Sequence, residues 1–243
     1  PDVPVVISQR QQEGIAQAFE NKAKEMHAAL VFGSDRYRVQ SNGIHDGLLQ
    51  VSVSDALTGV ILYPNLQLAL TGNYQLLNIC GVLAAVETLR TLGFPIQLEA
   101  IETGLAEVIA ITGLKGRWQK LQDQPAVYCD TAHNYEGVSE TMAQFASIPS
   151  SQQRFVIGFV GDKEVDKILQ LFPSDGQYYF CQPSNPRALP VEKLAEEAAK
   201  LGIQGNTFQH VNEALRFALQ ESEPSDTIYV GGSTFVVADI ENL

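Results

Sequence analysis

The segment that decides the fold is Ala126-Val127-Tyr128-Cys129-Asp130-Thr131-Ala132-His133-Asn134. It is a short apolar run that ends abruptly in polar side chains, which is typical of a buried parallel strand at its carboxyl end. A helix is expected from about Glu136 to Ala146, so its first backbone N–H groups would face the same crevice as those polar side chains. Open α/β sheets bind ligands at that edge. The segment therefore predicts an α/β fold with a ligand site directly after this strand.

Residues 124–243 show a regular alternation of strand and helix patterns. This alternation favours a doubly wound, Rossmann-like parallel sheet with helices on both faces. Apolar runs typical of strands lie at residues 126–129, 154–160, 177–181 and 227–230, with a shorter candidate at 207–208. Helices are expected to begin at about Glu136, Glu164, Val191, Val211 and Phe235.

Residues 1–123 are expected to form the other domain, again α/β. Strands at 3–7 and 30–32, with a helix at 10–28 between them, have the rhythm of a βαβ unit. The β-rich runs 47–53, 60–63 and 66–70 predict an antiparallel group in which Pro64-Asn65 is a hairpin turn. Two helices are expected next, one opening within 71–78 and ending near Gly93, the other at 98–109. Residues 121–124 are the expected hinge between the domains.

Composition narrows the class of protein. The chain has 243 residues, a formal net charge of -12 and 45% apolar residues, which is ordinary for a globular protein. The acidic balance argues against nucleic-acid binding, because neutralising phosphates requires a basic face. The sequence shows neither a run long enough for a membrane span nor a secretory signal pattern. The widely spaced Cys80, Cys129 and Cys181 indicate reduced, buried thiols of a cytoplasmic protein, with a metal site or a disulfide as the alternatives.

A local cluster of cations stands out against this acidic background. Lys115, Arg117 and Lys120 lie close together, shortly before the strand at 126–129. Arginine and lysine side chains are the usual partners of phosphate groups. The cluster therefore suggests an anionic small ligand, most simply a polyphosphate.

Four motifs, taken in chain order, resemble one known family. They are Gly72-x-x-Gln75-x-x-Asn78, then Gly116-Arg117 followed by Asp130-x-Ala132-His133-Asn134, then Gly161-Asp162-Lys163-Glu164, and finally Gly231-Gly232-Ser233. Together they resemble the folylpolyglutamate synthases and dihydrofolate synthases, the folate branch of the Mur ligase superfamily. The family more often has Asp-Lys-Asp at the third motif.

The resemblance assigns each domain a place in such an enzyme. Residues 1–123 would be the C-terminal part of the central ATP-binding domain, and 124–243 the Rossmann-like C-terminal domain. The family carries a P-loop near its amino terminus, whereas this sequence has no Gly-x-x-x-x-Gly-Lys-Ser/Thr segment. We therefore expect the chain to be the C-terminal portion of a longer enzyme and to be inactive alone. The Mg²⁺ ligands of the family are expected in the absent portion, and no metal-binding residue is assigned here.

The resemblance also implies a nucleotide site. Asn78 would contact adenine, Arg117 the phosphates of ATP, and Asp130 the ribose hydroxyls, whereas His133 would face the reacting centre as a catalytic residue. From the residues alone, the alternatives are a surface or capping amide for Asn78 and a solvated strand-edge charge for Arg117. Asp130 can be a turn residue, and His133 a packed loop histidine for which the sequence offers no partner to fix its tautomer. With Arg117 before the expected hinge and Asp130 after it, the two would lie on opposite sides of a closing crevice.

Two further residues concern the amino-acid substrate. Lys163 would contact the incoming amino acid or an acyl phosphate, and Ser233 would help to bind the added glutamate; a solvated loop and a plain turn are the alternatives. The reaction implied is ATP-dependent addition of L-glutamate to a folate or dihydropteroate carboxylate through an acyl phosphate. Rival interpretations are a sibling Mur-type ligase of cell-wall precursors and a non-catalytic flavodoxin-like or receiver-like module at 125–243.

Overall fold

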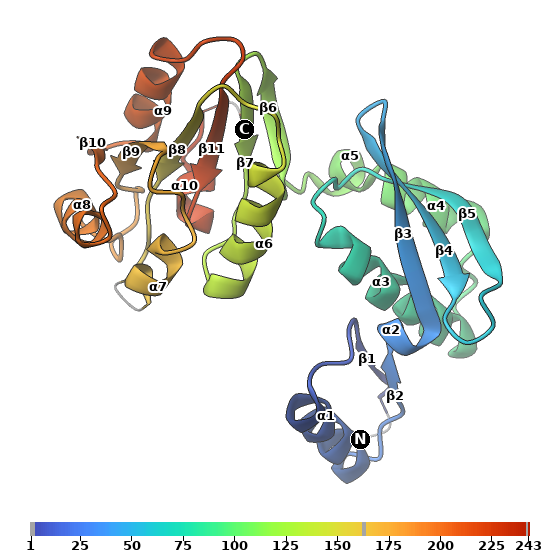
Figure 1. Ribbon diagram of the computed structural model, residues 1–243. Coiled ribbons are helices and arrows are strands. Elements are labelled where there is room, and N and C mark those ends of the chain that lie inside the picture. The colour runs from blue at the N-terminus through green and yellow to red at the C-terminus, as the bar shows by residue number, and fades with distance from the viewer. Residues whose placement is uncertain (1–2, 162–163, 242) are drawn as a thin grey trace. The chain divides into compact units, whose positions relative to one another are not determined.

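The structure is a computed structural model that describes residues 3–161, 164–241 and 243. The chain divides into two compact units, Pro1–Gly113 and Leu114–Leu243, and Figure 1 shows the elements of each. The units are described separately below.

The first unit begins with a small parallel βαβ arrangement. Strand β1 (Val5–Ile7) pairs with β2 (Leu30–Phe32), and helix α1 (Glu13–Glu25) connects them. The short helix α2 (Gly33–Arg36) follows. The βαβ prediction is therefore confirmed, with the helix shorter at both ends than its apolar pattern suggested.

A three-stranded antiparallel sheet comes next, in the order β3-β4-β5. It consists of β3 (Tyr37–His45), β4 (Leu48–Asp55) and β5 (Ile61–Leu68). The predicted turn at Pro64-Asn65 is wrong, because both residues lie inside β5. Strand β5 is at the sheet edge and its register with β4 shifts between Val51 and Val53, next to this dipeptide. A proline is tolerated there because an edge strand with a bulge does not need its N–H.

Three helices complete the first unit: α3 (Gln75–Thr91), α4 (Leu98–Ala106) and α5 (Val108–Thr112). Buried side chains of α3 and α4 pack on the sheet to form its core, which includes Val51, Val53, Leu66, Ile79, Leu83 and Ile101. Each of these side chains is almost completely removed from water. The hydrophobic effect on this shared face holds the helices against the strands.

The second unit is built on one six-stranded sheet. Its strands are β6 (Gln119–Asp123), β7 (Ala126–Cys129), β8 (Gln153–Ile157), β9 (Gln177–Cys181), β10 (Gly205–Phe208) and β11 (Thr227–Gly231). They are arranged in the order β10-β9-β8-β11-β7-β6. All pairings are parallel except that between β6 and β7. Strand β6 was not predicted, because its Gln-Lys-Leu-Gln-Asp composition lacks an apolar run.

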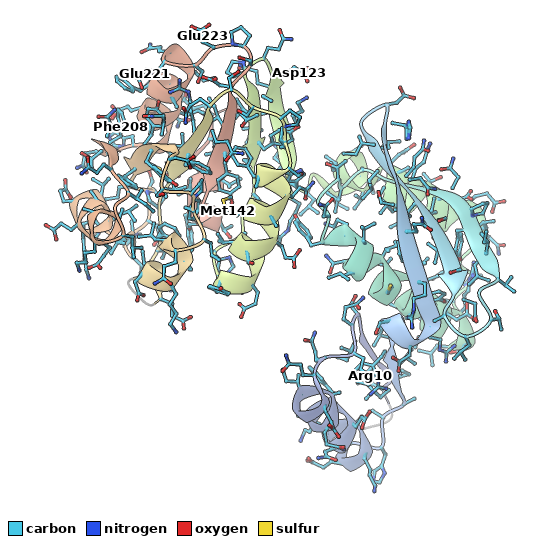
Figure 2. All side chains as sticks on the ribbon, in the orientation of Figure 1. Arg10, Asp123, Met142, Phe208, Glu221 and Glu223 are labelled. Carbon is cyan, nitrogen blue, oxygen red and sulfur yellow. The ribbon has the colours of Figure 1, made fainter. Side chains whose placement is uncertain are left out.

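Helices cover both faces of this sheet, which confirms the doubly wound architecture. The helices are α6 (Tyr135–Ala146), α7 (Val165–Leu169), α8 (Val191–Lys200), α9 (Val211–Gln220) and α10 (Thr234–Ala238). One face carries an aromatic cluster in which Phe145 of α6 contacts Phe155 and Tyr229 edge-on. The other face packs on α9 and α10. Figure 2 labels one residue from each face, Met142 of α6 and Phe208 of β10.

The predicted hinge at residues 121–124 is wrong. Strand β6 pairs with β7 from Gln119 opposite Cys129 to Asp123 opposite Ala126, and Leu121 packs against the core of the second unit. The compact units instead meet between Gly113 and Leu114. Arg117 therefore belongs to the same unit as Asp130, and the expectation that a hinge separates them is wrong as well.

Two simpler expectations concern the thiols and the membrane. The three cysteines are free and buried, and burial raises the thiol pKa of Cys129 to about 12. Within the described part of the chain, none of the helices has the length and apolar character needed to cross a bilayer.

The buried ion pair between Arg154 and Asp226 gives a test of the second unit. The Arg154 guanidinium donates to the Asp226 carboxylate at 3.0 Å and to the Tyr179 hydroxyl at 2.6 Å, and both charged side chains are largely buried. We expect Arg154→Met to lower the free energy of unfolding by about 3 kcal/mol, because it leaves a buried carboxylate without its cation. Urea unfolding followed by circular dichroism measures this.

The control for that measurement is Lys200→Met, which breaks the exposed i,i+3 pair of Lys200 with Glu197. Exposed pairs contribute only about 0.5 kcal/mol. Equal losses from the two substitutions would contradict a stabilising role for the buried pair.

Candidate functional site

A buried carboxylate organises the carboxyl end of β7. Asp130 follows the strand directly and is only 2% exposed. One of its carboxylate oxygens accepts the Trp118 backbone N–H at 2.7 Å, and the other accepts the Ala132 backbone N–H at 2.8 Å. The Thr131 N–H in turn donates to the Gly116 carbonyl at 3.0 Å. These bonds attach the loop 116–118 to the polar segment that ends the strand.

That loop has an unusual backbone. Gly116 and Trp118 both adopt left-handed conformations, with φ of 70° and 49°. A side chain at Gly116 would collide with Val237, since a Cβ there would lie 2.6 Å from Val237 Cγ1. A left-handed conformation at a bulky residue costs about 1 kcal/mol or more. The Trp118 indole is buried and stacks on Tyr128 with 5.2 Å between ring centroids, which helps to offset that cost.

Arg117 lies between these two residues, and its side chain is exposed. Its guanidinium donates to the hydroxyl of Thr131 at 2.6 Å. The other cations of the predicted cluster are engaged differently. Lys120 pairs with Asp123 at 2.6 Å, a hydrogen bond that raises its pKa, and Lys115 donates to the main-chain oxygen of Leu243. Of the cluster, Arg117 is the cation held in place by a neutral hydroxyl.

His133 has a partner that the sequence did not reveal. Its Nδ1 lies 3.1 Å from the carbonyl oxygen of Thr131. Because a carbonyl only accepts, Nδ1 carries the proton, and Nε2 of the neutral ring is then the acceptor. The next residue, Asn134, caps helix α6 by accepting the Gly137 N–H at 2.9 Å. The ring is thus held at the start of a helix, with its side chain exposed to solvent.

A pocket of about 240 Å³ adjoins this segment. His133, Phe159, Arg187 and Ser233 are among its lining residues, so it collects the ends of β7, β8, β9 and β11. The structure therefore brings His133 and Ser233 to one cavity, at the sheet edge where the sequence predicted a site. Ser233 is 3% exposed and caps α10, since its Oγ accepts the Phe235 N–H at 3.1 Å.

Sequence reasoning missed Arg187. It follows β9 in an irregular segment, where the Asn185 side chain accepts its N–H at 2.8 Å and its carbonyl accepts the Gly161 N–H at 2.8 Å. The side chain is exposed, and its guanidinium forms no hydrogen bond or ion pair with the described residues. Its position shortly after a predicted strand, at the same sheet edge as the other candidates, is the signal that could have identified it.

Two predicted residues are not brought into this cluster. Asn78 lies on α3 of the first unit, where its exposed amide donates to the Gln75 side chain at 3.1 Å. Lys163 lies outside the described residues. The roles of both remain predictions.

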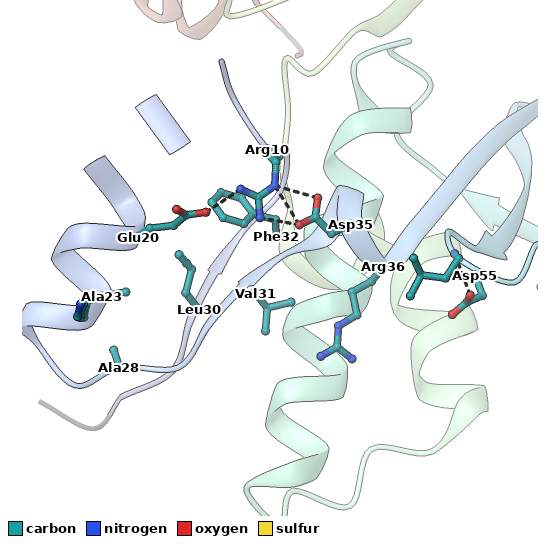
Figure 3. A pocket seen from close by; sticks show the side chains of 12 residues that line it. Arg10, Glu20, Ala23, Ala28, Leu30, Val31, Phe32, Asp35, Arg36 and Asp55 are labelled. Atoms are coloured by element: carbon teal, nitrogen blue, oxygen red, sulfur yellow. Dashed lines mark hydrogen bonds and ion pairs between the residues drawn. The ribbon is translucent and has the colours of Figure 1, made fainter. Parts of the chain in front are cut away.

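A larger hollow of about 680 Å³ lies in the first unit, beside α1 and β2 (Figure 3). Arg10, one of the cations that line it, contacts the carboxylates of Asp35 and Glu20 at 2.7 Å each and lies over the ring of Phe32. These two carboxylates offset the charge of the guanidinium. The hollow is therefore a poor candidate for an anion site.

The segment that forms this site is similar in sequence to known proteins. The model of the family "Mur ligase, glutamate ligase domain" matches residues 116–234, which include the loop, the end of β7 and the pocket. The chain is 29% identical over 158 residues to a dihydrofolate synthase/folylpolyglutamate synthase of Escherichia coli, covering 64% of this chain and 36% of that protein. It is 34% identical over 157 residues to the corresponding protein of Mycobacterium tuberculosis, covering 62% and 31%.

A solved structure of the Mycobacterium tuberculosis folylpolyglutamate synthase complexed with ADP superimposes with a TM-score of 0.82 at 25% identity. The match covers 98% of this chain and 54% of that one, so the chain spans about half the length of this solved relative. The range matched by the family model includes Arg117, Asp130 and His133. Over residues 116–234 the second unit is similar to the Mur ligase, glutamate ligase domain.

Proposed function

We propose that the chain is part of an ATP-dependent ligase that adds L-glutamate to a folate or dihydropteroate carboxylate through an acyl phosphate. The observation that carries the proposal is the exposed guanidinium of Arg117, held on a loop that the Asp130 carboxylate fixes to the ligand-binding edge of the sheet. The relatives named above support the folate substrate and the ATP dependence.

In this proposal one side of the site binds the nucleotide. Arg117 contacts the phosphates of ATP, because a planar guanidinium donates two parallel hydrogen bonds to phosphate oxygens. Asp130 contacts the ribose hydroxyls. An ionised carboxylate only accepts hydrogen bonds, which suits the hydroxyl donors of a ribose. Asn78 contacts the adenine edge, to which an amide can both donate and accept.

The pocket bordered by His133 and Arg187 binds the amino acid. It holds about 240 Å³, which suits a small substrate, and Arg187 offers a cation for a carboxylate of glutamate. Ser233 contributes to the same wall, and Lys163 is assigned to the incoming amino acid or the acyl phosphate. His133 is the catalytic residue beside the reacting carboxylate, oriented by the Thr131 carbonyl.

The chemistry is mainly positioning and charge stabilisation. The γ-phosphoryl group of ATP passes to the carboxylate, and the amine of glutamate then attacks the acyl phosphate and displaces inorganic phosphate. Such transfers use a divalent cation, and Mg²⁺ is the one we expect. Within the described residues, no group of three or more His, Cys, Asp or Glu side chains could hold a metal ion. As the resemblance to the folate ligases implies, we propose that the metal ligands belong to another part of the enzyme.

The proposed location and partners of the enzyme rest on the net charge of the chain and on its cysteine thiols. Three buried, unpaired cysteines support a cytoplasmic location. A net charge of -12 argues against nucleic-acid partners. We propose small-molecule substrates as partners, and neither nucleic acid nor a membrane. Folate enzymes among the relatives favour this proposal over a cell-wall ligase or a flavodoxin-like module.

The first prediction concerns the phosphate contact. In the complete enzyme, Arg117→Ala should lower turnover by about 10²-fold or more, the scale for loss of a charged transition-state donor. Arg117→Lys should restore little, because an ammonium group lacks the donor fork. Steady-state kinetics test this, with Arg216→Ala on the exposed side of α9 as the matched control. Near-normal kinetics for Arg117→Ala would remove this residue from the site.

The second prediction separates Asp130 from His133. Asp130→Ala should weaken ATP binding by about tenfold, since it removes a charged acceptor for the ribose. His133→Ala should instead lower the rate at saturating ATP by about 10²-fold, as expected for a group beside the reacting carboxylate. The measurements are the Kd for ATP and the saturated kcat, together with thermal unfolding, because Asp130 also holds the loop. Exchanged effects would show that the assigned roles are wrong.

The third prediction concerns Arg187. Arg187→Ala should raise the KM for glutamate by about tenfold or more, because it removes a charge-assisted hydrogen bond to the substrate carboxylate. The KM for ATP should change little. Initial rates at varied glutamate and at varied ATP distinguish the two, with Arg216→Ala again as the control. An equal rise in both KM values would contradict an amino-acid pocket at this position.

A further inference from the structure

Thr131 contacts the loop 116–118 with its backbone and both branches of its side chain. Its N–H donates to the Gly116 carbonyl at 3.0 Å, and its hydroxyl accepts the Arg117 guanidinium at 2.6 Å. Its methyl group borders Gly116, because a Cβ on that glycine would lie 2.9 Å from Thr131 Cγ2. Thr131 is itself 8% exposed and follows the anchored Asp130 directly. It is therefore a fixed point from which the exposed Arg117 side chain can be held.

The chemistry of this partner differs from that of the partners of two other arginines in the chain. Arg10 is paired with two carboxylates, as Figure 3 shows, and Arg154 is paired with Asp226. Among the described residues, Arg117 forms no ion pair, and its hydrogen-bond partner is a neutral hydroxyl. A hydroxyl orients the guanidinium but leaves its positive charge available to a ligand, whereas a carboxylate would neutralise that charge.

The geometry also leaves donors on the guanidinium. Arginine carries five N–H donors, and one of them, on Nη1, donates to the Thr131 hydroxyl. A side chain with one end fixed loses less rotamer freedom when it binds, so more of the interaction energy appears as binding or rate. The hydroxyl thus prepares the arginine for an anion before the anion arrives.

We propose that Thr131 is a positioning residue whose hydroxyl holds the Arg117 guanidinium in place for the phosphates of the nucleotide. This inference rests on the proposed function of Arg117 and extends it to a residue that does not itself contact the ligand. Thr131→Val is the decisive substitution, because it keeps the size and the methyl group that borders Gly116 while it removes the hydroxyl acceptor. Thr131→Ser is its counterpart, which keeps the hydroxyl and removes the methyl group.

The experiment is a double-mutant cycle in the complete enzyme, measured as kcat and as KM for ATP and for glutamate. Thr131→Val should lower kcat/KM for ATP about tenfold, the fold-change expected for loss of a hydrogen bond to a charged group. Thr131→Ser should retain most of the activity, and the KM for glutamate should stay unchanged in both. In the Arg117→Ala background, Thr131→Val should cause no further loss, because the group that it positions is gone.

Each other outcome has a definite meaning. Wild-type kinetics for Thr131→Val, with Arg117→Ala still impaired, would overturn this inference and leave the proposed function intact. An equal loss in the Arg117→Ala background would also overturn it, since Thr131 would then act independently of the arginine. Normal kinetics for Arg117→Ala itself would overturn the proposed role of the arginine, and the positioning role with it. Thermal unfolding of each variant shows whether a loss of activity comes from a loss of fold.

Discussion

The pair of hydrogen bonds from the backbone to the Asp130 carboxylate is the constraint on which the candidate site depends. A carboxylate that is only 2% exposed must have its charge met by donors, and here the N–H groups of Trp118 and Ala132 provide them. One donor comes from the loop that leads into the antiparallel edge strand β6, and the other from the turn after β7. These two hydrogen bonds therefore stabilise a buried charge and fix the position of Arg117 relative to the end of the sheet.

The site depends on the sheet in a second way, through residues that have no side chain. Gly231 ends the central strand β11 and Gly232 follows it, and a Cβ on Gly232 would lie 2.8 Å from the Gly158 carbonyl oxygen. Strands β8 and β11 can therefore end close together, and the pocket that holds His133 and Arg187 forms where they end. The candidate site residues and the closely packed glycines therefore lie at one edge of the sheet. The hydrogen bonds of Arg154 to Asp226 and Tyr179 lie at the opposite edge.

The periodic part of this architecture could be predicted from the sequence, and the non-periodic part could not. Four of the five parallel-paired strands of the second unit were predicted because buried parallel strands read as apolar runs. The fifth, β10, is mostly exposed and was predicted only as a shorter candidate at 207–208. Strand β6 was missed because an edge strand needs no such run, and the misplaced hinge followed from that omission. The residues of the site were found by motif, but their partners were not. The bond from Arg117 to Thr131 and the position of Arg187 depend on how separate segments of the chain fold together. The carbonyl that orients His133 belongs to Thr131, two residues away, and its position depends on the local backbone conformation, which the motif does not specify.

Trp118 is the single tryptophan of the chain, and it lies in the loop beside Arg117. Its indole is 3% exposed and stacks on Tyr128, while its own N–H is bound to Asp130. The indole fluorescence of this chain therefore originates from a side chain attached to the anchor of the site. A shift in its emission or a change in its quenching by iodide would report the local state of this loop, without a label and without interference from a second indole.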